Sequence, residues 1–318
     1  MRNFTSRFLI TICLLVSFHG MLKAVEPISP VPLPAPANKS EIKLGKLLFN
    51  DKRLSADNSI ACISCHEINK GGDDGLKTSL GINQQVGPIN TPTVLNSGLN
   101  AFQFWDGRVN TLEEQVEGPI HNVLEMGTTW SEVIRKLKRD EELVILFKEV
   151  YAQEPNEINI SRAIATYEKQ LVTLNAPFDL FLNGDKQAIS AQAKKGYLAF
   201  KTLGCISCHQ GKNVGGNMFQ RFGIMGDYFK NKGRINTVDY GRYNVTGKEE
   251  DKFKFKVPSL RNIELTAPYF HDGSASKLGD AIRVMARFQL GRPISTQQVE
   301  DIEAFLKTLT GTVKAELQ

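Results

Sequence analysis

The pentapeptide CISCH occurs twice in this chain, at Cys62–His66 and again at Cys205–His209. Two cysteines followed directly by a histidine are typical of c-type haem attachment. The thiols add to the two vinyl groups of the haem, and the neighbouring imidazole then binds the iron as its proximal ligand. The repeat therefore predicts two covalently bound haems c. The residues expected to hold them are Cys62, Cys65 and His66 in the first copy and Cys205, Cys208 and His209 in the second.

Three other uses of paired cysteines fit the repeat less well. A zinc site built from two Cys-x-x-Cys knuckles normally closes a loop of about 15–20 residues, whereas these pairs lie in different halves of the chain. A thioredoxin-like redox pair needs a βαβ context and has no use for the histidine that follows. Disulfides within each pair leave both histidines unexplained.

The first 24 residues have the organisation of a secretory signal peptide. Arg2 and Arg7 precede an apolar run from Phe8 to Phe18, and Ala24 offers a small residue for cleavage. The run is too short to cross a bilayer, although an uncleaved N-terminal anchor is the alternative. No later stretch is apolar for long enough to span a membrane. Export is consistent with haem c, and cleavage leaves the motif cysteines as the remaining thiols.

The charge of the chain argues against nucleic acid as a partner. There are 39 basic and 34 acidic side chains, a formal net charge of +5. Loss of the signal peptide removes Arg2, Arg7 and Lys23 and brings the balance still closer to neutrality. A nearly neutral protein lacks the electrostatic attraction that holds a phosphate backbone.

The hydrophobic pattern predicts a mostly α-helical chain of two cytochrome c-like domains, each wrapped around one covalent haem. Residues 25–39 form a Pro-rich leader, after which Ser40 is the expected N-cap of a helix. A helix precedes each CISCH, and a long irregular segment follows each one. Further helical patterns cover residues 130–151, 158–175, 277–289 and 296–311. We place the N-terminal domain at residues 40–175 and the C-terminal domain at 176–318.

The residue opposite each proximal histidine decides what that haem does. A methionine or a second histidine makes a six-coordinate electron carrier, whereas an open face permits peroxide chemistry. In the second half, Met218, Met225 and Met285 are equal candidates from the residues alone, and each could equally be a packing residue. Outside the signal peptide the other histidines are His121 and His271.

Several segments resemble the bacterial di-haem cytochrome c peroxidase family, to which the MauG-like enzymes that mature methylamine dehydrogenase are related. They are LGKLLFNDKRLS, INTPTVLNS, FWDGR, EQVEGP and VPSLRNIELTAPYFHDG, and the likeness runs from about residue 43 to 311. The resemblance implies a periplasmic enzyme, in this family often a homodimer. It reduces hydrogen peroxide to water with electrons from a small cytochrome c or cupredoxin.

Matched position by position, the resemblance assigns different roles to the two haems. His66 belongs to the peroxidatic haem and His209 to the haem where electrons enter. Met285 matches the methionine that completes the second haem, a position that is tyrosine in the methylamine branch. Trp105 matches a tryptophan between the haems.

The resemblance also implies roles for polar residues. Gln115 and Glu125 match a pair over the peroxidatic iron, where Glu125 moves a proton between the peroxide oxygens and Gln115 orients the peroxide. Outside that match, Glu125 is an ordinary solvated charge. Asn90, Thr266 and Pro268 match positions that bind a calcium ion between the domains.

One position departs from the family pattern. Many members cap the resting peroxidatic haem with a histidine in the loop that here reads TSLGINQQVGPIN, and the aligned residue is Ile82. Isoleucine cannot bind iron, so we expect this haem to be open in the oxidised protein. His121 is the one nearby substitute, and is otherwise a supporting or surface residue. His271 is expected to hydrogen-bond between the domains.

Two other functions compete with peroxide reduction. A non-catalytic di-haem electron-transfer cytochrome requires two six-coordinate haems, and the chain is short of ligands for that. A MauG-like enzyme that oxidises a partner protein is disfavoured by Met285 but is compatible with an open haem.

Overall fold

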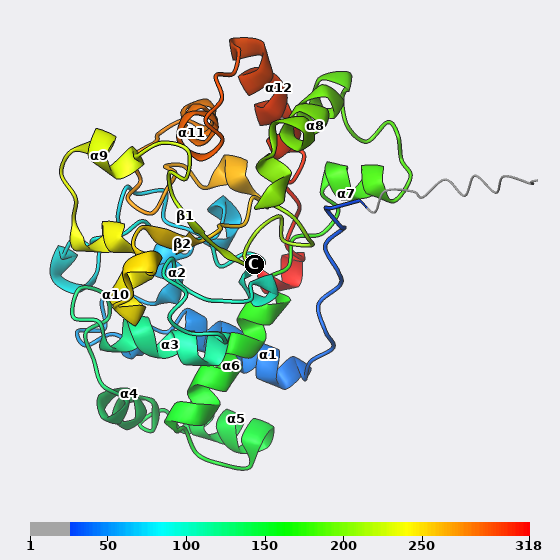
Figure 1. Ribbon diagram of the computed structural model, residues 1–318. Helices are drawn as coiled ribbons and strands as arrows, with labels where there is room; N and C mark the ends of the chain where they lie inside the picture. Colours follow the sequence, from blue (N-terminus) through cyan, green and yellow to red (C-terminus); the bar gives the residue numbers. More distant parts are fainter. Residues whose placement is uncertain (1–25) are drawn as a thin grey trace, which may run out of the picture.

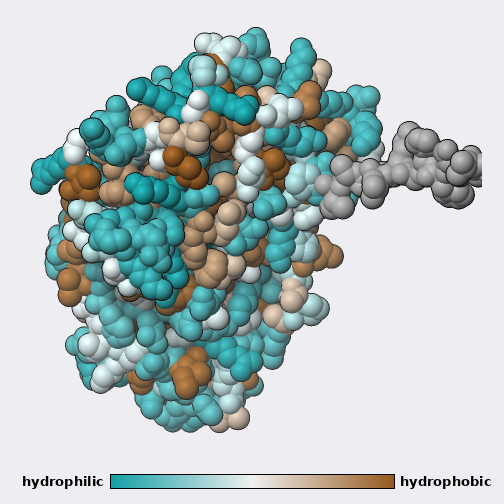
Figure 2. All heavy atoms as spheres, in the orientation of Figure 1, coloured by the Kyte–Doolittle hydropathy of each residue, from teal (hydrophilic) through white to brown (hydrophobic). Residues whose placement is uncertain are grey.

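The computed structural model describes residues 26–318, so the signal peptide predicted over residues 1–24 lies outside the described residues. The described chain is mostly helical, which confirms the predicted fold class (Figure 1). Its one small sheet pairs β1 (Phe219–Arg221) with β2 (Lys254–Lys256) in antiparallel register. Over the same range, no helix combines the length and apolar character needed to cross a membrane. The face shown in Figure 2 is mostly hydrophilic, with apolar residues in separate patches.

The helices of the first half of the chain lie mainly in the lower part of Figure 1 and those of the second half mainly in the upper part, with α2 and α10 at middle height. The first half contains α1 (Lys39–Phe49), α2 (Cys62–Cys65), α3 (Leu112–His121), α4 (Trp130–Leu137), α5 (Glu141–Tyr151) and α6 (Glu157–Gln170). The second half contains α7 (Pro177–Leu182), α8 (Ala191–Leu203), α9 (Tyr228–Lys232), α10 (Tyr243–Thr246), α11 (Leu278–Val284) and α12 (Thr296–Lys307). Short 3-10 turns and loops make up the rest.

Each half is built on a close crossing of two helices. In the first half α1 crosses α6, and a Cβ on Gly45 would lie only 2.0 Å from the Ala163 carbonyl oxygen. In the second half α8 crosses α12, and a Cβ on Gly196 would lie 1.8 Å from the Asp301 carbonyl oxygen. Glycine is therefore required at both crossings, because any larger residue would push the backbones apart. Both glycines lie on the helix that precedes a CISCH motif.

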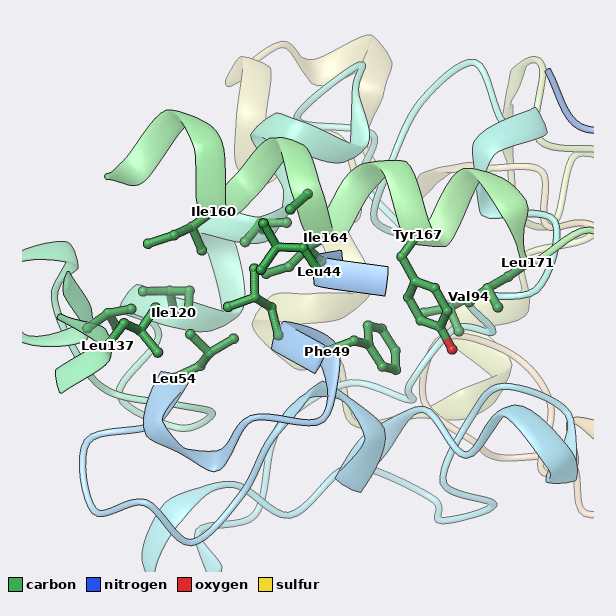
Figure 3. Close-up of a cluster of buried hydrophobic side chains, with 14 of the residues drawn as sticks. Leu44, Phe49, Leu54, Val94, Ile120, Leu137, Ile160, Ile164, Tyr167 and Leu171 are labelled. Carbon is green, nitrogen blue, oxygen red and sulfur yellow. The ribbon is translucent and has the colours of Figure 1, made fainter. Parts of the chain in front are cut away.

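Two separate hydrophobic cores surround these crossings. The first lies between α1, α3, α4, α5 and α6, where Leu44, Phe49, Ile164 and Tyr167 point toward one another (Figure 3). The second lies between α7, α8, α11 and α12, with Phe178, Phe200 and Phe305 in mutual ring contact. Burying these side chains removes apolar surface from water and holds each motif against its own core.

Both ends of the described chain pack against the opposite half. The Pro-rich leader starts beside the upper core, where Ile28 is buried, and runs down to α1 (Figure 1). Buried Arg261 donates to the Ser29 carbonyl at 2.9 Å and pairs with Asp179 at 2.7 Å. At the other end, Leu317 packs into the lower core, and its carbonyl accepts from Tyr167 at 2.7 Å. The domain boundary drawn at residues 175 and 176 stays a prediction.

Three local expectations differ from the structure. The N-cap of α1 is Asn38 rather than Ser40, because the Asn38 side chain accepts the Ser40 amide at 2.8 Å. The helical pattern over 130–151 is two helices, since Asp140 caps a new start at α5. Helix α3 was not predicted, although Thr111 and Glu114 form the capping box that begins it.

Two candidate haem sites

The first CISCH motif places its thiols and its histidine within one turn. Ser64 accepts the Ala61 amide at 3.0 Å and so begins α2, which carries Cys62 and Cys65. His66 follows, with Nδ1 3.1 Å from the Gly72 carbonyl oxygen. A carbonyl can only accept, so this contact puts the proton on Nδ1 and leaves Nε2 free for a metal. Burial lowers the pKa of His66, which keeps the ring neutral.

The second CISCH motif repeats this arrangement on different elements. Helix α8 ends at Leu203, and Gly204 turns the chain with a φ of 105° into the 3-10 turn Cys205–Ser207. Here Nδ1 of His209 faces the Val214 carbonyl oxygen at 3.4 Å, and burial lowers the pKa of the ring to about 4. The ring centroid of His209 lies 6.4 Å from that of Phe200, much as His66 lies 6.5 Å from Phe49.

A large cavity adjoins the second motif, and a histidine and a methionine able to bind iron both line it. Cys205, Cys208, His209 and Met285 all line this cavity, whose volume is about 250 Å³. Met285 begins the π-helical turn Met285–Gln289, a type of turn common at functional sites. Neither Met218 nor Met225 lines the cavity, and Met225 is 63% exposed. Of the three candidate methionines, Met285 is therefore the one placed to share a group with His209.

Glu125 lies near the first motif in the turn that follows α3. Together with burial and Asp74, its carboxylate raises the pKa of the Cys65 thiol to about 12. Burial raises the pKa of Glu125 itself, while a 2.7 Å hydrogen bond from Asn122 to Oε1 and the charge of Arg108 oppose that rise. Glu125 is thus a half-buried acid with a raised pKa, and the bond from Asn122 fixes one of its two oxygens.

Gln115 and His121 lie on α3, which leads into this turn. Gln115 is half-buried in the middle of the helix, and His121 is exposed at its end. The Nδ1 atom of His121 donates to the Thr128 carbonyl at 3.1 Å, and its ring packs edge-on to Trp130. The structure thus places His121 at the surface of the turn.

The loop that carries Ile82 is fastened directly to the Glu125 turn. The Ile82 amide donates to the Glu125 carbonyl at 2.9 Å, and the Gln85 side chain donates to the Val123 carbonyl at 3.0 Å. The Ile82 side chain is buried beside Gly127, where even a Cβ would come within 2.7 Å of its Cδ1. Ile82 therefore packs as a hydrophobic residue against the turn that supplies Glu125.

Trp105 forms part of the cavity wall. Its indole N–H donates to the Asn90 carbonyl at 2.9 Å, and its ring centroid lies 6.4 Å from that of His271. Asn90, Thr266 and Pro268, the residues matched to a calcium site, line the same cavity. The Asn90 amide nitrogen donates to the Leu76 carbonyl at 3.0 Å, so its side-chain oxygen is the remaining acceptor.

A buried charge cluster around His271 was not foreseen from the sequence. His271 Nε2 donates to Asp239 at 2.7 Å, and Lys232 bridges Asp239 and Asp272 at 2.6 and 2.7 Å. The ammonium group of Lys232 supplies the positive charge that the two carboxylates require. His271 and Asp272 belong to the segment VPSLRNIELTAPYFHDG, but their partners Lys232 and Asp239 carry no motif that sequence reasoning could use. The His271 side chain was expected to bond between the domains and instead bonds within the second half, while its backbone carbonyl accepts the Asn90 amide at 2.8 Å.

The side chains present fit two covalently bound haems. Within residues 26–318 the four motif cysteines are free thiols, and burial raises the pKa of Cys205 to about 11. Thiols kept neutral by burial are poor zinc ligands, because zinc binds the thiolate. The buried Oε2 of Glu168, near Cys62, has no hydrogen-bonding partner among residues 26–318, and the buried side chain of Lys256 lines the cavity. Such groups are expected where another molecule completes the interior.

Comparison with known proteins identifies the family. Residues 39–187 match the family described as di-haem cytochrome c peroxidase. The cytochrome c551 peroxidase of Nitrosomonas europaea is 46% identical over 293 residues, which cover 92% of this chain and 86% of that protein. This chain belongs to the di-haem cytochrome c peroxidase family. It is thus a member of a family of haem-dependent oxidoreductases, and two haems c are its expected cofactors.

Two further similarities complete the comparison. The cytochrome c peroxidase Ccp of Escherichia coli K12 is 47% identical over 294 residues, or 92% of this chain, but the matched region spans only 63% of that protein. Among solved structures, a MauG-like protein associated with microbial copper homeostasis superposes with a TM-score of 0.78 at 25% identity. The superposition covers 95% of this chain and 98% of the other chain. The fold is therefore shared with both branches of the superfamily.

Proposed function

We propose that this di-haem peroxidase reduces hydrogen peroxide to water in the periplasm, using electrons from a small cytochrome c or cupredoxin. The observation that carries the proposal is the difference between the two motif sites. His209 shares its cavity with the sulfur donor Met285, whereas the loop beside the first motif presents Ile82 next to the acid Glu125. One site is built to hold iron from both sides, and the other to admit a small molecule.

In the first site, the chain supplies a proton carrier and a positioning amide. A bound haem held by Cys62, Cys65 and His66 supplies the iron and the electrons for cleaving the O–O bond. Glu125 accepts the proton of the nearer peroxide oxygen and delivers it to the outer one, which leaves as water. Its raised pKa suits this exchange, because an acid shifted toward neutrality both takes up and releases a proton easily. Gln115 holds the peroxide by hydrogen bonds.

In the second site, the chain sets the haem up to accept electrons one at a time. Ligation by His209 and the thioether of Met285 favours the reduced iron and so raises its potential. Trp105 lines the cavity and is the residue we place on the path between the haems. Its indole is held in one orientation by the Asn90 carbonyl.

The first test is steady-state turnover of the mature, haem-loaded protein with hydrogen peroxide and a reduced small cytochrome c. The enzyme is not reduced beforehand, and oxidation of the cytochrome is followed by its absorption band. Turnover from the first seconds supports the proposal and an open first site. If peroxide changes the haem spectrum but no cytochrome is oxidised, oxidation of a partner protein becomes the better explanation.

The proposal includes a calcium ion, export and self-association. Oxygen atoms of Asn90, Thr266 and Pro268 suit calcium, and their common place on the cavity wall near Trp105 supports a site there. Calcium titration of chelator-treated protein measures that site. Export rests on the predicted signal peptide, and a homodimer rests on the family resemblance. Cell fractionation and light scattering test these two parts.

A further inference from the structure

Lys256 is the one lysine in residues 26–318 whose side chain is buried, with 7% of its surface exposed. It ends strand β2, where it pairs with Phe219 of β1, and its amide donates to the Trp105 carbonyl at 2.8 Å. Trp105 is on the wall of the large cavity, and Lys256 lines that cavity together with Cys208 and His209. The ammonium group is therefore held inside the molecule beside the second motif.

No hydrogen bond or ion pair to Lys256 Nζ is formed by any group in residues 26–318. Lys254, two residues earlier on the same strand, is partly exposed and pairs with Asp251 at 3.0 Å. Burial lowers the pKa of Lys256 to about 8, with Asp106 as the one charge that opposes the change. A buried ammonium without an anion is strongly destabilising, so such groups are nearly always paired.

The other basic groups on this cavity are already engaged or face solvent. His271 is bonded to Asp239, and Arg221 is exposed beside the ring of Phe253. A haem attached to Cys205 and Cys208 brings two propionate carboxylates into the same cavity. Lys256 is thus the buried cation that remains on the protein to pair with the two carboxylates of the cofactor.

We propose that Lys256 forms a buried ion pair with a propionate of the haem attached to Cys205 and Cys208, at the wall shared with Trp105. The ion pair deepens the proposed function, because it fixes a positive charge next to the haem assigned to electron uptake. Reduction adds one electron to that haem, and a nearby cation stabilises the added negative charge. Lys256 is therefore a positioning residue that raises the reduction potential of this haem.

The test compares Lys256→Met with Lys254→Met in the full haem-loaded protein. Methionine matches the length of lysine without its charge, and Lys254 is the control on the same strand. The midpoint potential of the second haem is measured by spectroelectrochemical titration without peroxide or donor. We expect a clear downward shift in Lys256→Met, little change in Lys254→Met, and a value near wild type in Lys256→Arg. Equal potentials in Lys256→Met and wild type would overturn the ion pair.

A second measurement does not depend on the Met variant folding. The propionate bending vibration of the wild-type haem is recorded by resonance Raman spectroscopy in water and in heavy water. A deuterium shift that disappears or changes in Lys256→Arg supports a direct bond to the lysine. Identical spectra in wild type and Lys256→Arg contradict it. Neither measurement involves turnover. If the wild-type protein does not reduce peroxide but Lys256→Met still changes the potential, peroxide reduction is refuted and the ion pair stands.

Discussion

Buried acids are treated differently in the two halves of the molecule. In the first half Glu168 has no hydrogen-bond partner, and burial raises its pKa to about 8. Glu125, in the same half, has a pKa raised by the same cause. In the second half burial would also raise the pKa of Asp239, but bonds from His271, the Asn236 amide and Lys232 hold it well below its usual range. Burial thus raises the pKa of these two acids of the first half, whereas Asp239 of the second half is ionised and paired. Glu41, a buried acid of the first half that accepts from Arg162 and Tyr151, is a paired exception.

This difference matches the two kinds of chemistry proposed for the halves. Peroxide cleavage needs groups that hold and release protons near neutral pH, and unpaired buried acids do this. Electron uptake needs a fixed charge distribution that does not titrate, and a closed set of ion pairs provides it. The same CISCH motif can therefore serve two functions, because the surrounding charges rather than the motif set each one.

The largest expected effect comes from replacing Glu125, the proposed proton carrier of the first half. Glu125→Gln keeps the size of the side chain and its bond from Asn122 but cannot carry a proton. We expect the rate of peroxide reduction to fall by roughly 10²–10⁴-fold with both haems retained. Stopped-flow absorption of the haem bands after mixing with peroxide measures that rate.

The matched control for that variant is Glu117→Gln, an exposed acid on α3 that faces solvent. Its rate should stay near that of wild type. If Glu125→Gln and Glu117→Gln behave alike, Glu125 plays no part in proton transfer and the contrast between the halves loses its functional meaning.

Next in size is the effect of filling the two helix crossings. Gly45→Ala and Gly196→Ala each place a methyl group within about 2 Å of a carbonyl oxygen, so each should lower the free energy of unfolding by about 1–3 kcal/mol or more. Chemical denaturation followed by circular dichroism measures both. Gly279→Ala on α11, where a Cβ has ordinary contacts at 3.4 Å, should be neutral or mildly stabilising. Equal effects at all three glycines would show that the crossings are not close-packed.

The unpaired acid Glu168 predicts a loss of stability on the alkaline side. Its folded pKa of about 8 lies above the ordinary value, so its contribution is full below about pH 4.5 and is lost as pH rises through 8. We expect roughly 1–3 kcal/mol of stability to disappear over that range. Glu168→Gln should flatten this part of the curve when unfolding is measured at a series of pH values.

Asp239 predicts the opposite dependence. Its depressed pKa contributes stability above its ordinary value near 4, and that contribution is lost as pH falls further. Lys232→Met should therefore weaken the acid side of the curve and leave the alkaline side to Glu168. A wild-type curve that is flat at both ends would contradict the contrast between unpaired and paired acids.

The smallest expected effect comes from adding a capping histidine to the first haem site. We expect the fully oxidised protein to show one high-spin and one low-spin haem by electron paramagnetic resonance. In Ile82→His a second low-spin signal should appear, and early turnover should fall by roughly tenfold or more, since only uncapped sites can bind peroxide. Ile82→Leu is the control. Two low-spin haems in the wild-type protein would show that another residue caps the first site.

Part of the candidate site could be predicted from the sequence because it depends on short-range chemistry. The order of residues in CISCH already places two thiols and an imidazole within one turn, wherever the motif lies in the fold. From the residues alone Met218, Met225 and Met285 are equally plausible; the family resemblance favours Met285, and the cavity that Met285 shares with His209 agrees with that choice. Helix α3 was missed although its capping box was visible, and Pro119 within it is a residue that argues against a helix interior.

The sequence by itself determined the cofactor type, the helical character and the repetition of one motif in two halves. These follow from covalent chemistry and from periodicities that neighbouring residues already express. The tertiary structure decided the surroundings of each motif. It brought Ile82 onto the Glu125 turn, left Lys256 unpaired in a cavity, and enclosed Asp239 with Lys232 and His271. Such differences depend on burial and on partners distant in the chain, and these are set only when the chain has folded.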